Sequence, residues 1–229
     1  MVVNHIRLDK YLAQLGLVSR RSIGKTISTG SILVDGEVVY KSDMKLTYGQ
    51  IISFAGQDIE VREYIYLILN KPAGYVCSDI DEWWHASYQH LLLDCPYGKM
   101  MHVAGRLDFD TEWLVLCSND GQFVHQIISP KKHLEKEYYI RTRDEIHEHA
   151  IYTLEHGVTL DDGYVTMPAK IQKIDTHTLK LIIVEWKFHQ VKRMVEAIWN
   201  QVIYLRRDRI GTWTTEWIDL WKWQYISWR

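Results

Sequence analysis

The sequence predicts an α+β protein of two domains. A small helix–turn–helix plus hairpin unit is expected over residues 1–62, and a larger domain with a mixed, mostly antiparallel sheet over residues 63–229. Two observations predict this fold. The first sixty residues hold two helical apolar patterns followed by a hairpin signal. After residue 63, strand-like and helical runs mix without the regular alternation that is typical of parallel βαβ folds.

The composition is that of an ordinary globular protein. Hydrophobic residues make up 47% and charged residues 24% of the 229 residues, which is usual for a soluble protein. Apolar runs stay below the roughly 18 residues that span a membrane, and the charged N-terminus is unlike a signal peptide. Three scattered cysteines without a CxxC motif predict a reducing, cytoplasmic compartment, with no disulfide framework and no zinc site.

Charge is spread unevenly along the chain. The net charge of −2 argues against a strongly basic nucleic-acid binder. Residues 1–62, however, contain eight Lys and Arg against six Asp and Glu, a net charge of +2, whereas the remainder carries −4. The front of the chain is therefore the favoured contact for a polyanion.

The first sixty residues predict a compact helical and hairpin unit. In RLDKYLAQLG the apolar residues Leu8, Tyr11, Leu12 and Leu15 follow helical spacing, and Gly16 suits the end of that helix. A second helix is expected over RRSIGKTIS, with Ser19 as its N-cap. ILVDGEVV then reads as two strands around an Asp-Gly turn.

Three basic side chains belong to the second predicted helix. Arg21 and Lys25 are four residues apart and share a face, with Arg20 about 100° round the helix. By themselves they indicate a solvated basic face. The whole stretch from RLDKYLAQLG to YKSDMKL, however, resembles the S4 RNA-binding domain. That resemblance implies that Arg20, Arg21 and Lys25 contact RNA phosphates, which position the protein without reading base sequence.

The remaining 165 or so residues predict the sheet domain. The strand-like runs are YIYLIL, HVAGRL, WLVLCS, EKEYYIRT and LKLIIVEW, and the helical patterns are RDEIHEHAIYTLEHG and FHQVKRMVEAI. Four blocks then appear in order: NKPAGYVCS, GRLDFDTEWLVLCSNDG, SPKKHLEKEYYI and EWKFHQVKRM. Together they resemble the pseudouridine synthase family whose members carry an S4 domain in front. HQVKRM with the following QVIYLRRDRIG is most similar to the enzymes that act on small-subunit ribosomal RNA.

The resemblance implies the isomerisation of uridine to pseudouridine, a reaction that requires particular groups in the site. Uridine becomes pseudouridine when its N1–C1′ bond breaks, the base rotates and C5 bonds to C1′. This isomerisation consumes no redox equivalent or energy source, so no cofactor is expected. It needs an ionised carboxylate beside C1′, as nucleophile or as stabiliser of positive charge. It also needs a pocket that takes the uridine out of its stack.

The family pattern assigns these roles to four residues. Asp108 in GRLD matches the catalytic aspartate. Lys192 in HQVKRM matches the basic residue that keeps this aspartate ionised and in place. Tyr138 in EKEYYI matches the tyrosine that stacks on the flipped base and assists movement of the C5 proton. Arg106 is a weaker assignment, as a contact to the backbone of the flipped nucleotide.

Each of these residue types has an ordinary structural explanation when it is taken alone. A strand-end Asp is usually a turn residue, a lone Tyr is usually core, and a Lys at a helix start is usually exposed; only their joint order favours a site. Asp110 and Glu112 are interpreted as acids on the surface or as acids that support the catalytic residues without contacting the substrate. The eleven histidines lack Cys or carboxylate partners at ligand spacing, so no metal site is predicted.

Two other functions remain open. One is a non-catalytic S4-type RNA-binding protein, such as a ribosome-assembly factor with a decayed synthase domain; the other is a synthase acting on large-subunit RNA. In each case the expected partner is ribosomal RNA or an assembling ribosomal particle, with no membrane, and the chain is expected to be a monomer.

The ten tryptophans are unusual, because several stand where the family pattern has glycine. The positions that we single out are Trp84, Trp113, Trp186, Trp199 and Trp217. One explanation is a divergent fold that accommodates them. The other is that UGA is read as glycine in the source organism, and the count of 13 glycines, below the roughly 7% average, favours it. Tryptophan beside the active-site blocks would overpack them at about 1–3 kcal/mol per site.

Overall fold

The computed structural model describes residues 5–19 and 21–228, and these form two compact units. The first unit runs to Ile65 and also contains Leu92–Met101, and the second contains Tyr66–Leu91 and His102 onward. The predicted domain boundary between residues 62 and 63 lies close to this division. No helix among the described residues has the length and apolar character needed to cross a membrane.

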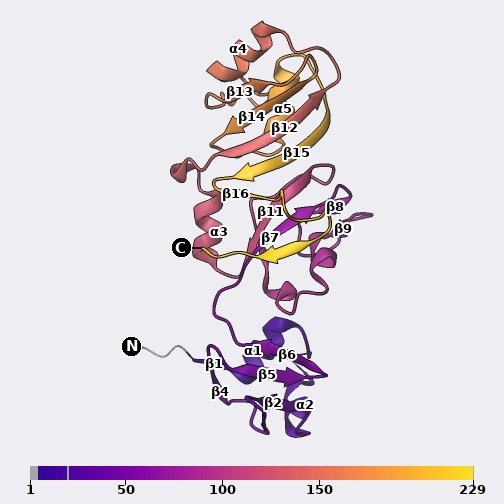
Figure 1. The fold of residues 1–229 in the computed structure, drawn as a ribbon, viewed down its shortest axis with the longest axis vertical. Coiled ribbons are helices and arrows are strands. Elements are labelled where there is room, and N and C mark those ends of the chain that lie inside the picture. The colour runs from indigo at the N-terminus through magenta and orange to yellow at the C-terminus, as the bar shows by residue number, and fades with distance from the viewer. Residues whose placement is uncertain (1–4, 20, 229) are drawn as a thin grey trace. The chain divides into compact units, whose positions relative to one another are not determined.

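The first unit is a helix pair with small sheets (Figure 1). Its helices are α1 (Leu8–Leu15) and α2 (Ile23–Ser28). Its strands are β1 (His5–Arg7), β2 (Ile32–Val34), β3 (Glu37–Val38), β4 (Lys45–Thr47), β5 (Ile51–Phe54) and β6 (Gln57–Glu60). The strands β3, β2, β5 and β6 form an antiparallel sheet in that order, and β1 pairs with β4. The predicted helix, its end at Gly16 and the Asp-Gly hairpin are confirmed.

The second helix differs from its prediction. It begins at Ile23 rather than at residue 20, and its N-cap is Ser22 rather than Ser19. Ser19 instead starts a turn, because its carbonyl accepts hydrogen bonds from the backbone of Ser22 and Ile23 at 3.0 Å. The local Ser-rich sequence favours such a turn over another helical turn.

The second unit is built on one large sheet. Its strand order is β13-β14-β12-β15-β11-β7-β17, with β10 beside β11 and β16 beside β15. The strands are β7 (Tyr66–Lys71), β10 (His102–Ala104), β11 (Glu112–Ser118), β12 (Lys136–Thr142), β13 (Lys170–Lys173), β14 (Thr178–Ile183), β15 (Val202–Ile210), β16 (Trp213–Thr214) and β17 (Trp223–Tyr225). All pairs in this sheet are antiparallel except β11 with β15. This agrees with the predicted mixed, mostly antiparallel sheet.

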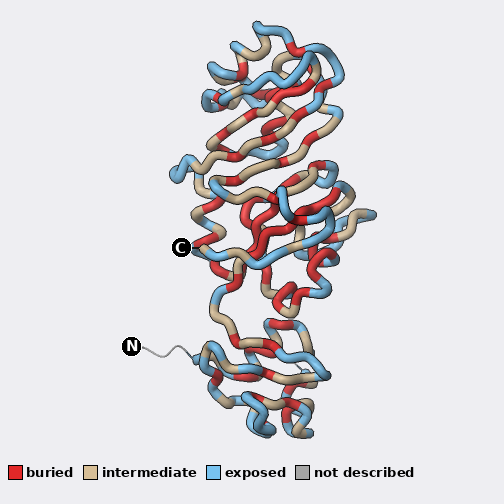
Figure 2. The backbone as a smooth tube through the Cα atoms, viewed as in Figure 1, coloured by how far each residue is buried: buried red, intermediate tan, exposed pale blue. Residues whose placement is uncertain are grey.

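Helices and short segments complete the second unit. They are α3 (Gly121–Ile128), α4 (Glu148–His156), α5 (Gln190–Ala197) and the parallel pair β8 (Tyr75–Val76) with β9 (Ala86–Ser87). Sequence patterns indicated α4 and α5 but missed α3 and β15. Buried backbone is concentrated in β7 and β11 (Figure 2). Phe123 of α3 packs against Ile68, Leu114 and Leu116 in one apolar cluster on this sheet.

Candidate active site

The loop between β10 and β11 carries the predicted catalytic aspartate. Asp108 begins a turn in which the Thr111 backbone N–H donates to the Asp108 carbonyl at 3.1 Å. The neighbouring Phe109 carbonyl accepts from Gly74 N–H at 2.8 Å, which ties this loop to the NKPAG segment. The Asp108 side chain is 24% exposed. The carboxylate is thus half-sheltered on a loop whose backbone is held from two sides.

A buried arginine forms hydrogen bonds to the backbone of the same loop. Arg207 of β15 is fully buried, and its guanidinium donates to the carbonyl of Leu114 at 2.7 and 3.0 Å. It also donates to the carbonyl of Gly105 at 2.8 Å and, more weakly, to that of Arg106 at 3.4 Å. It therefore joins the residues before Asp108 to strand β11. Sequence analysis missed this residue, whose only signal is its place at an inward position of β15, two residues after the buried Leu205.

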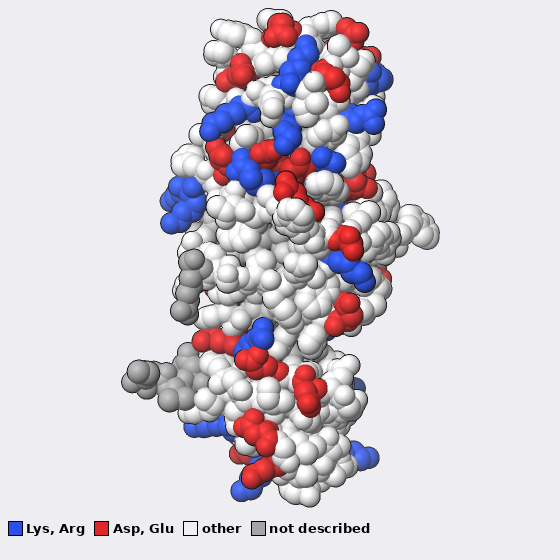
Figure 3. Space-filling view, in the orientation of Figure 1, with Lys and Arg blue, Asp and Glu red and all other residues white. Residues whose placement is uncertain are grey.

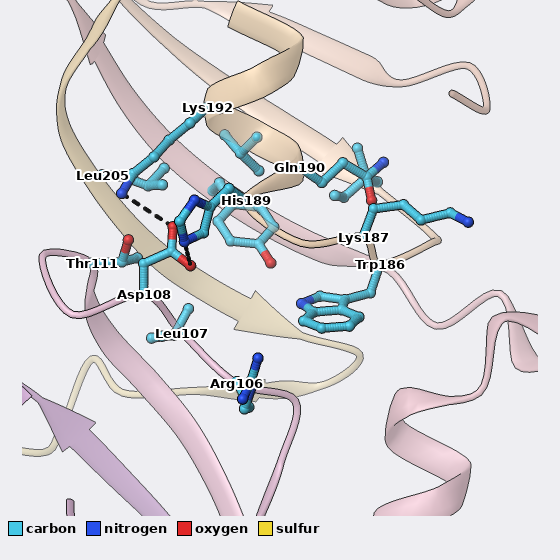
Figure 4. Close-up of a pocket in the computed structure, with 13 residues that line it drawn as sticks. Arg106, Leu107, Asp108, Thr111, Trp186, Lys187, His189, Gln190, Lys192 and Leu205 are labelled. Atoms are coloured by element: carbon cyan, nitrogen blue, oxygen red, sulfur yellow. Dashed lines mark ion pairs between the residues drawn. The ribbon is translucent and has the colours of Figure 1, made fainter. Parts of the chain in front are cut away.

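Lys192 lies directly against the carboxylate. Its Nζ is 3.1 Å from Asp108 Oδ2 (Figure 4). The same Nζ is 2.5 Å from Asp110 Oδ1. Burial opposes the charged form, but the hydrogen bond to Asp110 and the field of Asp108 outweigh it, so the pKa of Lys192 is raised. The lysine therefore stays charged beside the Asp108 carboxylate. Asp110, interpreted from sequence as a surface acid or as one that supports the catalytic residues, takes part in this ion-pair network.

A histidine missed by sequence analysis completes the contacts to Asp108. His189 is the N-cap of α5, with a left-handed φ of 49°. Its Nε2 lies 3.5 Å from Asp108 Oδ1, so the carboxylate has a nitrogen on each side (Figure 4). Both nitrogens come from the first turn of α5 or its cap, and that helix start thereby positions the pair.

The four predicted site residues line one small hollow. Asp108, Tyr138, Lys192 and Arg106 border a space of about 30 Å³. Tyr138 lies on β12 and is only 5% exposed. A wider hollow of about 260 Å³ adjoins it and shares Asp108, Arg106 and Trp186 with it. The indole of Trp186 borders both spaces (Figure 4).

Two further cations are buried in the core of this unit. Lys71 is 0% exposed and donates to the Pro72 carbonyl at 2.9 Å. Lys136 is 2% exposed and donates to the Leu134 carbonyl at 3.1 Å. Burial lowers the pKa of each lysine to about 8, and the charge of Arg207 contributes in the same direction.

The basic residues predicted to contact RNA belong to the first unit. Lys25 is exposed on α2, and Arg21 is exposed in the turn before that helix rather than on it. Arg20 lies outside the described residues. On the visible face of the molecule, Lys and Arg alternate with Asp and Glu rather than forming one large basic surface (Figure 3).

Several tryptophans have backbone conformations that favour glycine. The φ angles of Trp113 and Trp199 are 80° and 60°, where a bulky L-residue is a clear outlier. Trp83 and Trp221, which were not singled out from sequence, have φ of 53° and 74°. The other three singled-out tryptophans, Trp84, Trp186 and Trp217, are not among the described residues with positive φ. The Trp113 indole stacks on Arg206, whose Cζ lies 3.9 Å from a ring centroid.

Comparisons with known proteins match both units of the chain. Residues 65–197 match the RNA pseudouridylate synthase family, and residues 6–52 match the S4 domain. The ribosomal small subunit pseudouridine synthase A of Yersinia pestis is 39% identical, over 90% of this chain and 88% of that protein. Its counterpart in Escherichia coli K12 is 38% identical over 90% and 89%.

Two further proteins are similar to this chain over most of its length. An uncharacterized RNA pseudouridine synthase of Bacillus subtilis is 37% identical over 90% of this chain and 88% of its own length. A crystal structure of a pseudouridylate synthase superposes with a TM-score of 0.68 at 33% identity, covering 97% of this chain and 96% of that one. The chain therefore belongs to the RNA pseudouridylate synthase family and carries an S4 domain in front of the synthase domain.

Proposed function

We propose that this chain isomerises one uridine of small-subunit ribosomal RNA to pseudouridine, with Asp108 as the catalytic carboxylate. The observation that carries the proposal is the ion pair between Asp108 Oδ2 and Lys192 Nζ at 3.1 Å, in a hollow that Tyr138 also lines. The choice of RNA is supported by relatives at 37–39% identity that are named small-subunit synthases.

The residues divide the chemistry as follows. Asp108 acts at C1′ while the N1–C1′ bond breaks, as nucleophile or as a stabiliser of positive charge. The freed base turns, C5 bonds to C1′, the C5 proton leaves and N1 gains a proton. Lys192 keeps the carboxylate ionised. Tyr138 stacks on the base and assists removal of the C5 proton, and Arg106 contacts the nucleotide backbone.

The S4 unit supplies RNA affinity in this proposal. Arg20, Arg21 and Lys25 contact phosphates, so they position the substrate without selecting the base. The substrate is ribosomal RNA or an assembling ribosomal particle in the cytoplasm, and the chain works as a monomer. Replacing Arg21 and Lys25 with Ala should weaken RNA binding and flatten its salt dependence while leaving the rate at saturating RNA unchanged.

The decisive experiment compares two neighbouring carboxylates. The unsubstituted chain, Asp108→Asn and Asp110→Asn are each incubated with small-subunit transcript, with large-subunit transcript and with partly assembled particles. Pseudouridine is then mapped by carbodiimide-dependent primer-extension stops. We expect Asp108→Asn to abolish the stop while RNA binding is retained. Asp110→Asn is expected to keep measurable product, because it leaves the Lys192–Asp108 pair intact.

Two other outcomes would overturn the proposal. A stop only on large-subunit RNA would keep the enzyme and change its target. No stop on either RNA, with binding intact, would favour a non-catalytic RNA-binding protein.

A further inference from the structure

Two residues of the hollow that contains Asp108 each have a buried polar atom with no hydrogen-bond partner among the described residues. These atoms are the Thr111 hydroxyl oxygen and the Gln190 amide oxygen. Thr111 is 1% exposed and Gln190 4% exposed, and both line the hollow that Asp108 and Tyr138 border. A buried acceptor without a partner is costly. Such an atom in a binding hollow indicates a ligand group that satisfies it.

The orientation of the Gln190 amide follows from its neighbour. Its Nε2 donates to Glu185 Oε1 at 2.7 Å. The Glu185 carboxylate also accepts from the Tyr164 hydroxyl at 2.6 Å and from Met167 N–H at 2.9 Å. Because an ionised carboxylate only accepts, the amide nitrogen must face Glu185. The amide oxygen is therefore the atom of Gln190 that has no partner, and it can only accept.

We propose that the Gln190 amide oxygen accepts the N3–H of the flipped uracil and so selects uracil over cytosine. This rests on the function proposed above. Uracil presents a donor at N3, whereas cytosine presents an acceptor there, so a fixed acceptor favours the first and repels the second. Thr111 offers no such discrimination, because a hydroxyl both donates and accepts.

The position of Gln190 suits this role. It is the first residue of α5, two residues before Lys192, so one helical turn presents the base acceptor and the cation that holds Asp108. The hollow of about 30 Å³ adjoins a wider one of about 260 Å³. The Trp186 side chain borders both hollows.

The test measures binding, so that it is independent of chemistry. Asp108→Asn serves as an unreactive background, alone and combined with Gln190→Met. Each protein is titrated with a substrate RNA that carries uridine or 3-deazauridine at the target, since the second base has C–H in place of N3–H. We expect the single variant to prefer uridine by roughly 5- to 100-fold and the double variant to lose that preference. If the two proteins prefer uridine over 3-deazauridine by the same factor, the proposal is overturned.

Two further variants separate recognition from folding. Gln172→Met changes an exposed glutamine of β13 and should leave the uridine preference unchanged. Glu185→Gln keeps Gln190 but lets its amide turn, so it should also reduce the preference for uridine. This variant replaces Gln190→Met in the test if Gln190→Met does not fold. If the unsubstituted chain makes no pseudouridine, the proposed function fails; if it makes pseudouridine and the preference survives in both variants, only the role of Gln190 fails.

Discussion

The two units of this chain have very different cores. Among the described residues, every buried polar or charged side chain lies in the second unit, including Lys71, Lys136 and Arg207, whereas the buried core of the first unit consists of residues such as Leu8, Leu12 and Ile27. Burying polar groups is costly unless they are hydrogen-bonded. The buried polar groups are thus concentrated in the unit that carries the candidate active site. There the Arg207 side chain is hydrogen-bonded to the loop of Asp108.

The units differ equally in their left-handed backbone positions. In the first unit the non-glycine residues with positive φ are Asp35 and Ala55, each followed by glycine in a two-residue hairpin turn. This is the usual place for such a conformation. In the second unit they are Trp83, Trp113, His133, His189, Trp199 and Trp221.

Two helix ends make the contrast concrete. Helix α1 ends at Gly16 with φ 71°. After helix α5, Trp199 has φ 60°, its N–H donates to Glu196 O at 2.9 Å, and Asn200 N–H donates to Val195 O at 3.1 Å. This pair of bonds is a Schellman motif, whose left-handed position is usually glycine. A left-handed residue therefore follows both helices, and it is glycine in the first unit and tryptophan in the second.

The largest expected effect comes from replacing all four left-handed tryptophans by glycine, in a variant with Trp83, Trp113, Trp199 and Trp221 changed together. A left-handed L-residue costs about 1–2 kcal/mol, and distant sites add, so we expect the free energy of unfolding to rise by about 2–4 kcal/mol after loss of indole packing. Urea denaturation measures it. A fall in stability would show that the fold has adapted to these indoles.

The same comparison tests the reading of UGA as glycine. Mass spectrometry of the protein from its natural source identifies the residues at these positions. Glycine at 83, 113, 199 and 221 is the expected result, because the backbone there has the conformation that glycine adopts freely. Tryptophan at 113 and 199 would contradict the hypothesis and leave the strain as a property of the natural chain.

The next effect concerns pH and the buried lysines. The pKa of Lys71 is about 8 in the folded protein, because burial disfavours its charge, against an ordinary value of 10.5. Between these values the unfolded chain binds more protons, so stability rises with pH. We expect Lys71 to add about 2 kcal/mol to the free energy of unfolding between pH 7.5 and 9.5.

Urea midpoints at the two pH values measure this rise. Lys71→Met should remove the part of this rise in stability that Lys71 contributes. The part contributed by Lys136, whose pKa is lowered to the same value, should remain. Lys41→Met, at an exposed lysine of the first unit, should leave the slope unchanged. A slope that Lys71→Met does not alter would mean that Lys71 is hydrated in solution.

A smaller effect is expected at the end of helix α5. Trp199 and Trp217 are 94% and 88% exposed, so neither contributes much buried area, but only Trp199 has positive φ. Trp199→Gly should stabilise the protein by about 1 kcal/mol, because the strain is relieved. Trp217→Gly should destabilise it slightly, because glycine gains entropy in the unfolded chain. Thermal melts compare the two, and equal shifts would exclude backbone strain as the cause.

The smallest effect is expected in the first unit, where glycine is replaced by alanine rather than tryptophan by glycine. A Cβ added at Gly36 or at Gly24 meets no heavy atom within 4 Å, but Gly36 has φ 83° in its hairpin turn while Gly24 lies inside α2. Gly36→Ala should destabilise the fold by about 1 kcal/mol through strain. Gly24→Ala should stabilise it by a similar amount through helix propensity, about 1 kcal/mol. Equilibrium unfolding that moves both in one direction would contradict this account.

Local patterns predicted much of the fold because their causes are local. The spacing of Leu8, Tyr11, Leu12 and Leu15 determines the buried face of α1, and an Asp-Gly pair suffices for a hairpin turn. The start of α2 was predicted wrongly, because a serine turn and a helix compete over the same few residues. Strand β15 was missed, since its charged residues hide an alternating pattern.

For the candidate site, sequence alone determined which residue types the chemistry needs and named Asp108, Tyr138, Lys192 and Arg106, which the fold brings to one hollow. Only the tertiary structure decided what surrounds them. Arg207 comes from a strand about a hundred residues after the Asp108 loop, and the orientation of the Gln190 amide depends on Glu185. The hydrogen bonds and burial that define such groups depend on distances in space, and local sequence patterns do not contain those distances.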